Sequence, residues 1–536
     1  MKKKLYFVFL TFSLLFISAC GNNFKTEFDV ESGVYSVGKD IPNSGYTITC
    51  EETNYSMHVI VFESKANYDD YQNADRSTIG QESTAIDQNA LYDFYLRAEE
   101  TGYLGLEKGY VLSIESGNGK LKKIDANDPD SELYSGVYFA GNDLKASQYM
   151  LTCNDAAYSM QVMVFETVDS YKKYYQTSKF TTGEEIDAIG QNALYDYYIS
   201  VGETGYIGLE SGYVLLIDDG NGKLNELDIK NNNTSELYGG VYFVDNDLDA
   251  NQYVLTCNEA TFSMQVMVFE SLDTYVNYHQ TSRFTLGEES EAIEQNVLYD
   301  VYISPDEQCC LNLKDGYVLL IDSGKGTLNK LDTSNNDTKE LYCGIYFVDS
   351  DIKADQYVLT CEEADYSMQV MIFESIDTYK NYHQTSRFTI GEENDAIEQN
   401  VLYDVYISPE EQCYLDLKDG YVVLTDSGKG TLNKLDAQTN KVYSGMYLVG
   451  DNLEAAKYSL KCIDSHMQIT LFESIDKYKA YHQTSRFTIG EESYAIEQNA
   501  ISSDYIYGDR TLDINLQEGN ILLIDGGVGE LTMIGK

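Results

Sequence analysis

Five copies of one segment make up most of the chain, and this repeat restricts the fold more than any other feature. The copies align on a glycine–aromatic start at Gly33, Gly136, Gly240, Gly344 and Gly445. Successive starts are 103, 104, 104 and 101 residues apart. Solenoid units usually repeat every ~20–50 residues, whereas independent domains commonly have about 100. The spacing therefore predicts five tandem domains.

The fourth copy shows the pattern inside one domain. Apolar and aromatic runs bounded by turn residues predict strands at 344–348, 356–361, 368–374, 401–407, 412–417, 420–425 and 431–435. Ser375 is the expected N-cap of a helix, and 391–400 is expected to be a turn or a second helical turn. Hydroxyl residues recur at the cap position as Ser64, Thr167, Ser271, Ser375 and Ser474.

This pattern predicts a mainly β protein. We expect five tandem antiparallel β-sandwich-like modules, each with one short helix insertion, and small β-barrel modules are the alternative. The expected divisions are a signal peptide at 1–19, a polar tether at 20–31, and modules at 32–126, 134–229, 238–333, 342–437 and 443–536.

The N-terminus carries an export signal. Three lysines precede an apolar run at 5–17, which is too short to span a bilayer comfortably and is typical of a signal peptide. The run ends in Ile17-Ser18-Ala19-Cys20, which resembles the bacterial lipobox with Ile in place of the usual Leu. The resemblance implies that Cys20 is lipidated and becomes the mature N-terminus. We therefore expect a lipid-anchored protein at the extracytoplasmic face of the cell membrane.

The charge restricts the partners. The chain has 37 Lys and Arg against 87 Asp and Glu, a net charge of −50. Such a surface repels phosphate backbones, so nucleic acid is not expected as a partner. Disorder does not follow, because 48 Tyr and 20 Phe supply enough apolar surface for cores. The expected partners are the membrane, through Cys20, and a cell-wall, glycan or protein ligand.

The start of the first copy resembles a known type of module. Gly33-Val-Tyr35-Ser-Val-Gly38-Lys-Asp40-Ile41-Pro42 is similar to the Gly-x-Tyr-x-x-Gly-x-Asp-Ile-Pro opening of β-rich modules in secreted proteins and lipoproteins of Gram-positive bacteria. Lys108-Gly109-Tyr110 and Asp419-Gly420-Tyr421 are comparable to a later strand of those modules. Only the first copy has the proline, and Gly45 sits one residue late. The resemblance implies the location and the fold of the protein only, and it points to no enzymatic activity.

Several polar residues occupy the same register in every copy. A Phe-Glu pair precedes the helix, a cation follows the Glu by thirteen residues, and a Gln-Asn pair comes later. The full set is Glu63, Arg76, Gln88, Asn89, Glu166, Lys179, Gln191, Asn192, Glu270, Arg283, Gln295, Asn296, Glu374, Arg387, Gln399, Asn400, Glu473, Arg486, Gln498 and Asn499. One interpretation is a polar ligand pocket in each module. The other is structural: an Arg–Glu ion pair that holds the helix, with Asn capping a turn.

Other candidate sites do not recur in every copy. His279, His383 and His482 share a register that holds Gln72 and Tyr175 in the first two copies, so a shared catalytic or metal-binding histidine is not expected. We expect a satisfied, half-buried histidine on the helix. The segment 218–224 faintly resembles a calcium loop, but Ile217 would occupy its first ligand position, so a glycine-rich hairpin turn is expected. No cofactor, metal or catalytic residue is predicted.

The cysteines suggest a hypothesis about disulfides. Cys50, Cys153, Cys257, Cys361 and Cys462 recur on the expected inward face of the second strand, where a lone cysteine acts as a small apolar residue. The third and fourth copies add further cysteines. Export would permit disulfides, and the hypothesised pairs are Cys257–Cys309, Cys361–Cys413 and Cys310–Cys343.

Two functions of different classes are consistent with these features. The first is a non-catalytic surface protein whose modules bind a cell-wall, glycan or protein ligand multivalently, or act as spacers. The alternative is an envelope hydrolase with a single active module. A transporter's solute receptor usually has two α/β lobes, so this β-rich repeat does not match that class.

Overall fold

The protein is described from a computed structural model, which is mainly β as predicted. The structure describes residues 26–53, 55–128, 132–177, 182–230, 234–281, 286–331, 338–385, 390–436, 439–464, 466–484, 490–508 and 510–535. The predicted signal peptide and Cys20 lie outside these residues. The chain divides into two units. Unit 1 holds residues up to 203 and 209–226, and unit 2 holds 204–208 and residues from 227 onward.

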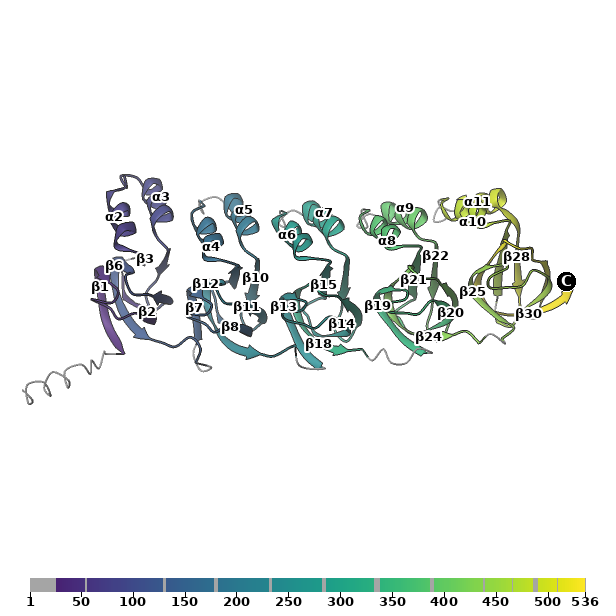
Figure 1. Ribbon diagram of the computed structural model, residues 1–536, viewed down its shortest axis with the longest axis horizontal. Coiled ribbons are helices and arrows are strands. Elements are labelled where there is room, and N and C mark those ends of the chain that lie inside the picture. The colour runs from purple at the N-terminus through teal and green to yellow at the C-terminus, as the bar shows by residue number, and fades with distance from the viewer. Residues whose placement is uncertain are drawn as a thin grey trace, which may run out of the picture. The chain divides into compact units, whose positions relative to one another are not determined.

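Copy one, in unit 1, shows how each module is built (Figure 1). Its elements are β1 (Glu27–Ser36), β2 (Ser44–Glu52), β3 (Met57–Phe62), α2 (Lys65–Asn73), α3 (Ile79–Asn89), β4 (Tyr92–Leu96), β5 (Thr101–Leu106) and β6 (Val111–Lys123). The long strands β1 and β6 pair along their whole length. The first half of β6 also pairs with β3, which pairs with β4, and its second half pairs with β2, which pairs with β5. The result is two antiparallel layers that share β1 and β6, a sandwich-like arrangement.

The bend between the layers lies where the sequence suggests a hairpin turn. In copy two a single strand, β12 (Val214–Leu227), continues through the residues of the expected turn, so the hairpin prediction is wrong. Its pairing register with β7 shifts between Ile217 and Asn221, with Asp219 and Gly220 at positive φ. A β-bulge of this kind bends one strand without ending it. The two strands predicted at 420–425 and 431–435 are likewise one strand, β24 (Val422–Lys434).

Two helices, rather than one, follow the third strand of each copy. All six residues of β3 are buried, as expected for a strand covered on both faces. Phe62 at its end packs on Tyr68 and Tyr71 of α2. The predicted N-caps are confirmed in all five copies, with the hydroxyl oxygen accepting the backbone N–H three residues on. The second helix, α9 (Ile390–Asn400) in copy four, occupies the segment predicted as a turn or a second helical turn.

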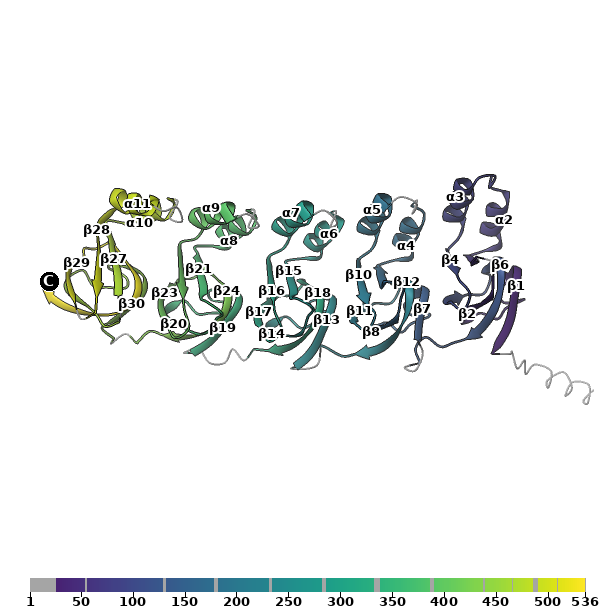
Figure 2. The ribbon, with the colours of Figure 1, turned by 180° about the vertical axis from the view of Figure 1, so that it is seen from behind.

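The remaining elements repeat this order. Copy two has β7 (Glu132–Phe139), β8 (Ser147–Asp155), β9 (Ser159–Phe165), α4 (Val168–Tyr175), α5 (Thr182–Asn192), β10 (Tyr195–Ser200), β11 (Thr204–Leu209) and β12. Copy three has β13 (Thr234–Phe243), β14 (Asn251–Glu259), β15 (Met264–Phe269), α6 (Leu272–Gln280), α7 (Leu286–Asn296), β16 (Tyr299–Ile303), β17 (Gln308–Leu313) and β18 (Val318–Lys330). Figure 2 shows the same elements from behind, with the helix pair of each copy on one side of its strands.

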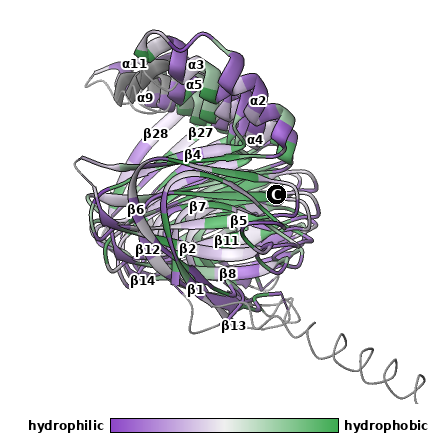
Figure 3. Cartoon of the chain, turned by 90° about the vertical axis from the view of Figure 1, so that its left-hand side faces the viewer, coloured by the Kyte–Doolittle hydropathy of each residue, from purple (hydrophilic) through white to green (hydrophobic). Residues whose placement is uncertain are grey.

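Unit 2 also contains the last two copies. Copy four has β19 (Thr338–Phe347), β20 (Asp355–Glu363), β21 (Met368–Phe373), α8 (Ile376–His383), α9, β22 (Tyr403–Ile407), β23 (Gln412–Leu417) and β24. Copy five has β25 (Lys441–Leu448), β26 (Lys457–Cys462), β27 (His466–Phe472), α10 (Ile475–His482), α11 (Glu491–Asn499), β28 (Ala500–Tyr507), β29 (Thr511–Asn515) and β30 (Ile521–Gly535). In Figure 3 many strand residues are coloured as hydrophobic, and the helices carry both hydrophilic and hydrophobic residues.

The first strands begin before the glycine–aromatic start. They start at residues 27, 132, 234, 338 and 441, whereas the predicted modules start at 32, 134, 238, 342 and 443. In copy one, residues 27–31 of the predicted tether pair with the second half of β6. No helix among the described residues is long and apolar enough to cross a membrane.

Candidate functional site

Three of the five recurring Glu residues lie at the joints between neighbouring copies. Here a joint means the contacts that one copy makes with the first helix and first strand of the next. In three joints the Glu after the third strand forms an ion pair with a lysine of the next copy's first helix. The pairs are Glu63–Lys172 at 2.8 Å, Glu270–Lys380 at 2.6 Å and Glu374–Lys479 at 2.6 Å. The predicted Arg–Glu pair within one module is therefore wrong for Glu63, whereas the predicted partners of Glu270 and Glu374 lie outside the described residues.

Two further side chains of the same helix bind the preceding copy. The hydroxyl of Tyr171 donates to the Leu91 carbonyl at 3.1 Å, and Tyr379 and Tyr478 donate to Leu298 and Leu402 in the same way. One turn further on, Tyr175 donates to Asp93 at 2.5 Å. The equivalent contacts in unit 2 are His383–Asp300 and His482–Asp404, both at 3.0 Å.

The predicted helix histidines are more deeply buried than expected, and His383 and His482 each have a carboxylate partner. His279, His383 and His482 are 3%, 3% and 2% exposed. A buried carboxylate needs a partner, and the histidine or Tyr175 of the next copy supplies one. Among the described residues, no three His, Cys, Asp or Glu side chains converge as ligands for a metal ion.

The strands of neighbouring copies also meet. In unit 1 β5 pairs with β7 in parallel, and Tyr103 stacks on Tyr138 with ring centroids 3.9 Å apart. Gly136, at φ +151°, lies against this strand: an added Cβ would be 2.7 Å from the Tyr103 carbonyl oxygen. Gly344 and Gly445 have equally close approaches, to Cys310 and Tyr414. The close packing of backbone at the joint therefore leaves no room for a side chain at the glycine that starts the repeat.

The joint also holds a half-buried acidic residue. The Asp143 carboxylate accepts the Phe139 N–H at 2.9 Å, and an added Cβ at Gly105 of copy one would be 2.8 Å from it. Burial raises the pKa of Asp143 to about 6, against the opposing effect of its hydrogen bonds to Phe139 and Tyr103. Asp247, Asp351 and Asn452 accept the equivalent N–H in the later copies.

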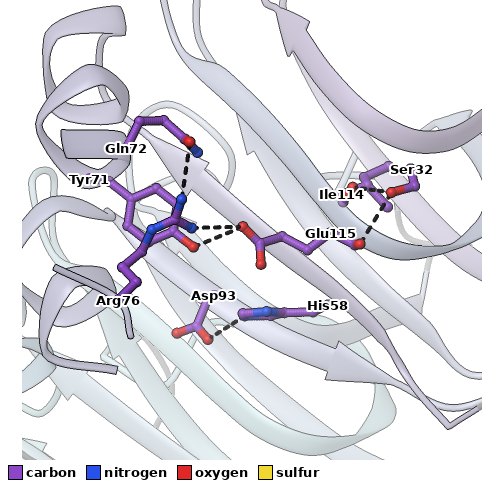
Figure 4. A network of polar contacts seen from close by, with 8 residues as sticks. All are labelled: Ser32, His58, Tyr71, Gln72, Arg76, Asp93, Ile114 and Glu115. Atoms are coloured by element: carbon purple, nitrogen blue, oxygen red, sulfur yellow. Dashed lines mark hydrogen bonds and ion pairs between the residues drawn. The ribbon is translucent and has the colours of Figure 1, made fainter. Parts of the chain in front are cut away.

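Among the predicted cations only Arg76 lies within the described residues (Figure 4). Its guanidinium stands 4.4 Å from the centre of the Tyr71 ring, donates to Gln72 and comes within 3.9 Å of Glu115. Glu115 also accepts the Tyr71 hydroxyl at 2.8 Å. Arg76 therefore holds the helix to β6 and does not contact Glu63. Lys179, Arg283, Arg387 and Arg486 fall outside the described residues.

The Asn of each Gln-Asn pair has a structural role. Each is the last residue of the second helix, and its side-chain amide donates to the carbonyl four residues earlier at 2.8–3.0 Å. This bond adds a side-chain donor to a carbonyl in the last turn of the helix. The five residues are Asn89, Asn192, Asn296, Asn400 and Asn499, and their contacts lie within the second helix and not at a turn. Of the glutamines, Gln295 donates to Glu291 at 2.9 Å.

The hypothesised disulfides are not formed. All nine described cysteines are free and buried, and Cys50, Cys153, Cys257, Cys361 and Cys462 are inward as predicted. The strand register explains the missing bonds. Cys309 lies opposite Leu255, Cys413 lies opposite Leu359, and Cys310 lies opposite Gly344 while Cys343 lies opposite Cys309. The paired residues of the hypothesis are therefore offset along their strands.

The first and last copies carry different residues at the joint positions. The first helix of copy one has Asp69 and Gln72 in place of the lysine and the Tyr or His. In copy five Ser503 stands where Asp404 accepts a histidine, as the pairing of both strands shows. The joint contacts are thus specific to interior faces. The third copy has Val276 in place of the lysine.

A recurring exposed tyrosine is absent from the predicted set. Tyr95, Tyr198, Tyr302, Tyr406 and Tyr505 occupy one register and are 60%, 54%, 53%, 52% and 56% exposed. Each lies directly opposite a residue of the third strand, which is His58 in copy one and a glutamine in the other four. The sequence shows this register in four copies, where the exposed tyrosine lies two positions after the Asp of a Tyr-Asp pair. We call these five residues the tyrosine register.

Comparisons with known proteins give no family. No protein-family model matches the chain, and no curated protein matches it. Among solved structures, a weak match is to a chain in "Life in the extremes: atomic structure of Sulfolobus Turreted Icosahedral Virus". The two are 8% identical, the match covers 58% of this chain and 87% of that one, and the TM-score is 0.15. A likeness of this size carries no argument about fold or function.

Proposed function

We propose that the chain is a non-catalytic surface protein that binds a cell-wall, glycan or protein ligand multivalently and is held at the extracytoplasmic face of the membrane by a lipid on Cys20. The tyrosine register carries the proposal. One large aromatic side chain stays more than half exposed at the same position in all five copies. Residues needed only for packing are buried, whereas an exposed aromatic residue that recurs in this way is typical of a binding surface.

The neighbours of the tyrosines support this assignment. Gln161, Gln265 and Gln369 are buried opposite Tyr198, Tyr302 and Tyr406, and their side-chain Nε2 makes no hydrogen bond within the described residues. In copy five the Tyr505 hydroxyl donates to Gln468 at 2.6 Å. The exposed aromatic face suits a sugar ring or a peptide, because either can stack on it.

Stepwise removal of the register tests multivalency in the intact five-copy chain. Variants with one, two, three and then all five tyrosines changed to Ala are applied to glycan, peptidoglycan and peptide arrays. We expect binding to fall more steeply than in proportion to the number removed, because avidity multiplies the contributions of linked sites. Tyr507→Ala is the control, since Tyr507 is 54% exposed but outside the register. Absence of any ligand on all three arrays would overturn the binding role.

The anchor is tested separately. Cys20→Ser removes the sulfur to which the lipid is attached, so the protein is expected to move from the membrane fraction to the medium or the soluble fraction. Labelling with a radioactive fatty acid should be lost in the same variant. Retention of both membrane association and label would contradict the anchor without affecting the binding experiment.

A further inference from the structure

We propose that the clefts at two of the joints bind segments of a partner protein that carry lysine or arginine side chains. This inference rests on the proposed binding function and names the chemistry of the ligand. It concerns the cleft between copies one and two, inside unit 1, and the cleft between copies three and four, inside unit 2.

The first cleft encloses 1030 Å³ between copies one and two. Its walls include the register tyrosine Tyr95, the turn residues Glu99 and Glu100 of copy one, and Asp155 of copy two. Tyr55 also lines the cleft and is 92% exposed. Clefts of about 300–1,000 Å³ commonly hold small molecules, so there is room for several side chains of a peptide.

The second cleft repeats this construction at equivalent positions. It encloses 640 Å³ and is lined by Tyr302, Asp306, Glu307 and Glu363, which correspond to Tyr95, Glu99, Glu100 and Asp155. Tyr366 is part of its wall and is 91% exposed. The same combination of aromatic and acidic residues thus lines joints in both units.

The charge of both clefts is strongly negative. Seven carboxylate residues line the first cleft against one cation, Arg97, which lies 4.0 Å from Glu100. Six line the second against Lys429, which is paired with Glu340 at 3.2 Å. No lysine or arginine of the described chain forms an ion pair with Glu99, Asp155, Asp306 or Glu363. Basic side chains of a partner would supply the missing positive charge and would be steered toward the clefts.

The tyrosines add a second reason for a basic ligand. A lysine or arginine over an exposed aromatic ring gains about 0.5–1 kcal/mol, and this attraction adds to that of nearby carboxylates. The carboxylates are spread along the walls, with no three of the described ones converging on one point as metal ligands would. Spacing of this kind matches several charges along a peptide better than a single ion.

Fluorescence anisotropy with a labelled ten-residue peptide of alternating lysine and glycine tests the proposal on the five-copy chain from residue 26. The cleft variant combines Glu99→Gln, Asp155→Asn, Asp306→Asn and Glu363→Gln. Its matched control combines Glu27→Gln, Asp29→Asn, Asp513→Asn and Glu518→Gln, which are exposed acids outside both clefts. Both variants change the net charge equally. We expect at least a tenfold loss of affinity in the cleft variant and less than a twofold loss in the control.

A second variant tests the aromatic contribution. Tyr95→Ala with Tyr302→Ala should weaken peptide binding about threefold to tenfold, and Tyr507→Ala should leave it unchanged. Equal losses in the cleft variant and its charge control would overturn the proposal, because they would indicate only nonspecific attraction to an acidic protein. Equal binding of a glutamine–glycine peptide would also overturn it.

Two further outcomes separate the ligand sources and the two proposals. If spermidine at the same total charge displaces the peptide completely, the occupant is a small polyamine and the peptide assignment is wrong. If array ligands bind through the tyrosine register while the basic peptide does not bind, this inference fails and the proposed function stands. If no array ligand binds but the basic peptide does, the peptide contact stands and the multivalent role fails.

Discussion

The joint between copies one and two and the joint between copies three and four use the same positions with different chemistry. Both have the Lys–Glu ion pair and the Tyr hydroxyl on a backbone carbonyl. The third contact is Tyr175 to Asp93 in the first joint and His383 to Asp300 in the other. At the strands, Tyr103 lies where the other joint has Cys310.

The difference shows what each position must supply. Asp93 and Asp300 are both largely buried, and both bind a donor from the next copy's helix. A phenol and an imidazole each provide that donor, so the residue type changes while the hydrogen bond remains. Asp93 has a second donor, His58, at 3.0 Å. Asp93 therefore binds one donor from its own copy and one from the next copy.

The largest expected effect comes from the glycine that both joints share. Gly136→Ala and Gly344→Ala place a Cβ 2.7 Å from a backbone carbonyl at φ near +150°. Strain and overpacking together should lower the free energy of unfolding of the affected copies by about 3–5 kcal/mol. Urea unfolding measures the loss. Gly33→Ala is the control, because its nearest neighbour would be 3.9 Å away, and it should change stability by less than about 1 kcal/mol.

The second prediction concerns pH and the half-buried acid of the first joint. Burial raises the folded-state pKa of Asp143 to about 6 from an ordinary 3.8. The shift of the Asp143 pKa therefore stabilises the folded state fully below about pH 4. This contribution to the free energy of unfolding, about 3 kcal/mol, is lost as the pH rises through 6.

Asp143→Asn removes that dependence. Asn452 already fills the equivalent position in copy five and accepts the same kind of N–H at 2.7 Å. We expect the variant to gain about 3 kcal/mol relative to the unmodified chain between pH 4 and pH 7. Urea unfolding at each pH, taken as the difference between the two proteins, measures the gain. A difference that is constant with pH would contradict the prediction.

The third contact provides a smaller and directly comparative test. His383→Leu removes a donor from buried Asp300 and should cost about 2–3 kcal/mol. Tyr175→Phe should cost only about 1 kcal/mol, because Asp93 keeps His58. Hydrogen exchange of the backbone amides in α8 and α4 reports the local stability of each joint. Equal losses of stability in the two joints would show that His58 does not compensate Asp93 for the lost Tyr175 hydroxyl.

The smallest effect is expected at the ion pair, where the two joints should behave alike. Lys172 and Glu63 are 33% and 37% exposed, and both partners of Lys380–Glu270 are 37% exposed. Lys172→Met and Lys380→Met should each cost less than about 1 kcal/mol. The cost should shrink in 1 M salt, where screening removes most of the attraction. A loss above 2 kcal/mol in either joint would show that the pair organises the joint.

Sequence patterns predicted the local structure well where a few neighbouring residues decide it. The N-caps, the fully buried third strand and the inward cysteines all follow from such patterns. The continuous last strand was missed because Gly428 and its neighbours look like a turn, while pairing along both sides keeps the strand intact. The second helix was left open because its short polar segment has only a weak apolar face.

The candidate site was predictable only as a set of registers. The repeat alone placed Glu63, Glu270 and Glu374 in one register with Glu166 and Glu473, and it placed the helix caps and strands around them. Their partners come from the next copy, more than 100 positions away in the chain. Periodicity and capping act over a few residues, so they follow from the sequence. Which charges meet, which acids become buried and which tyrosines remain exposed depend on the packing of one copy against another.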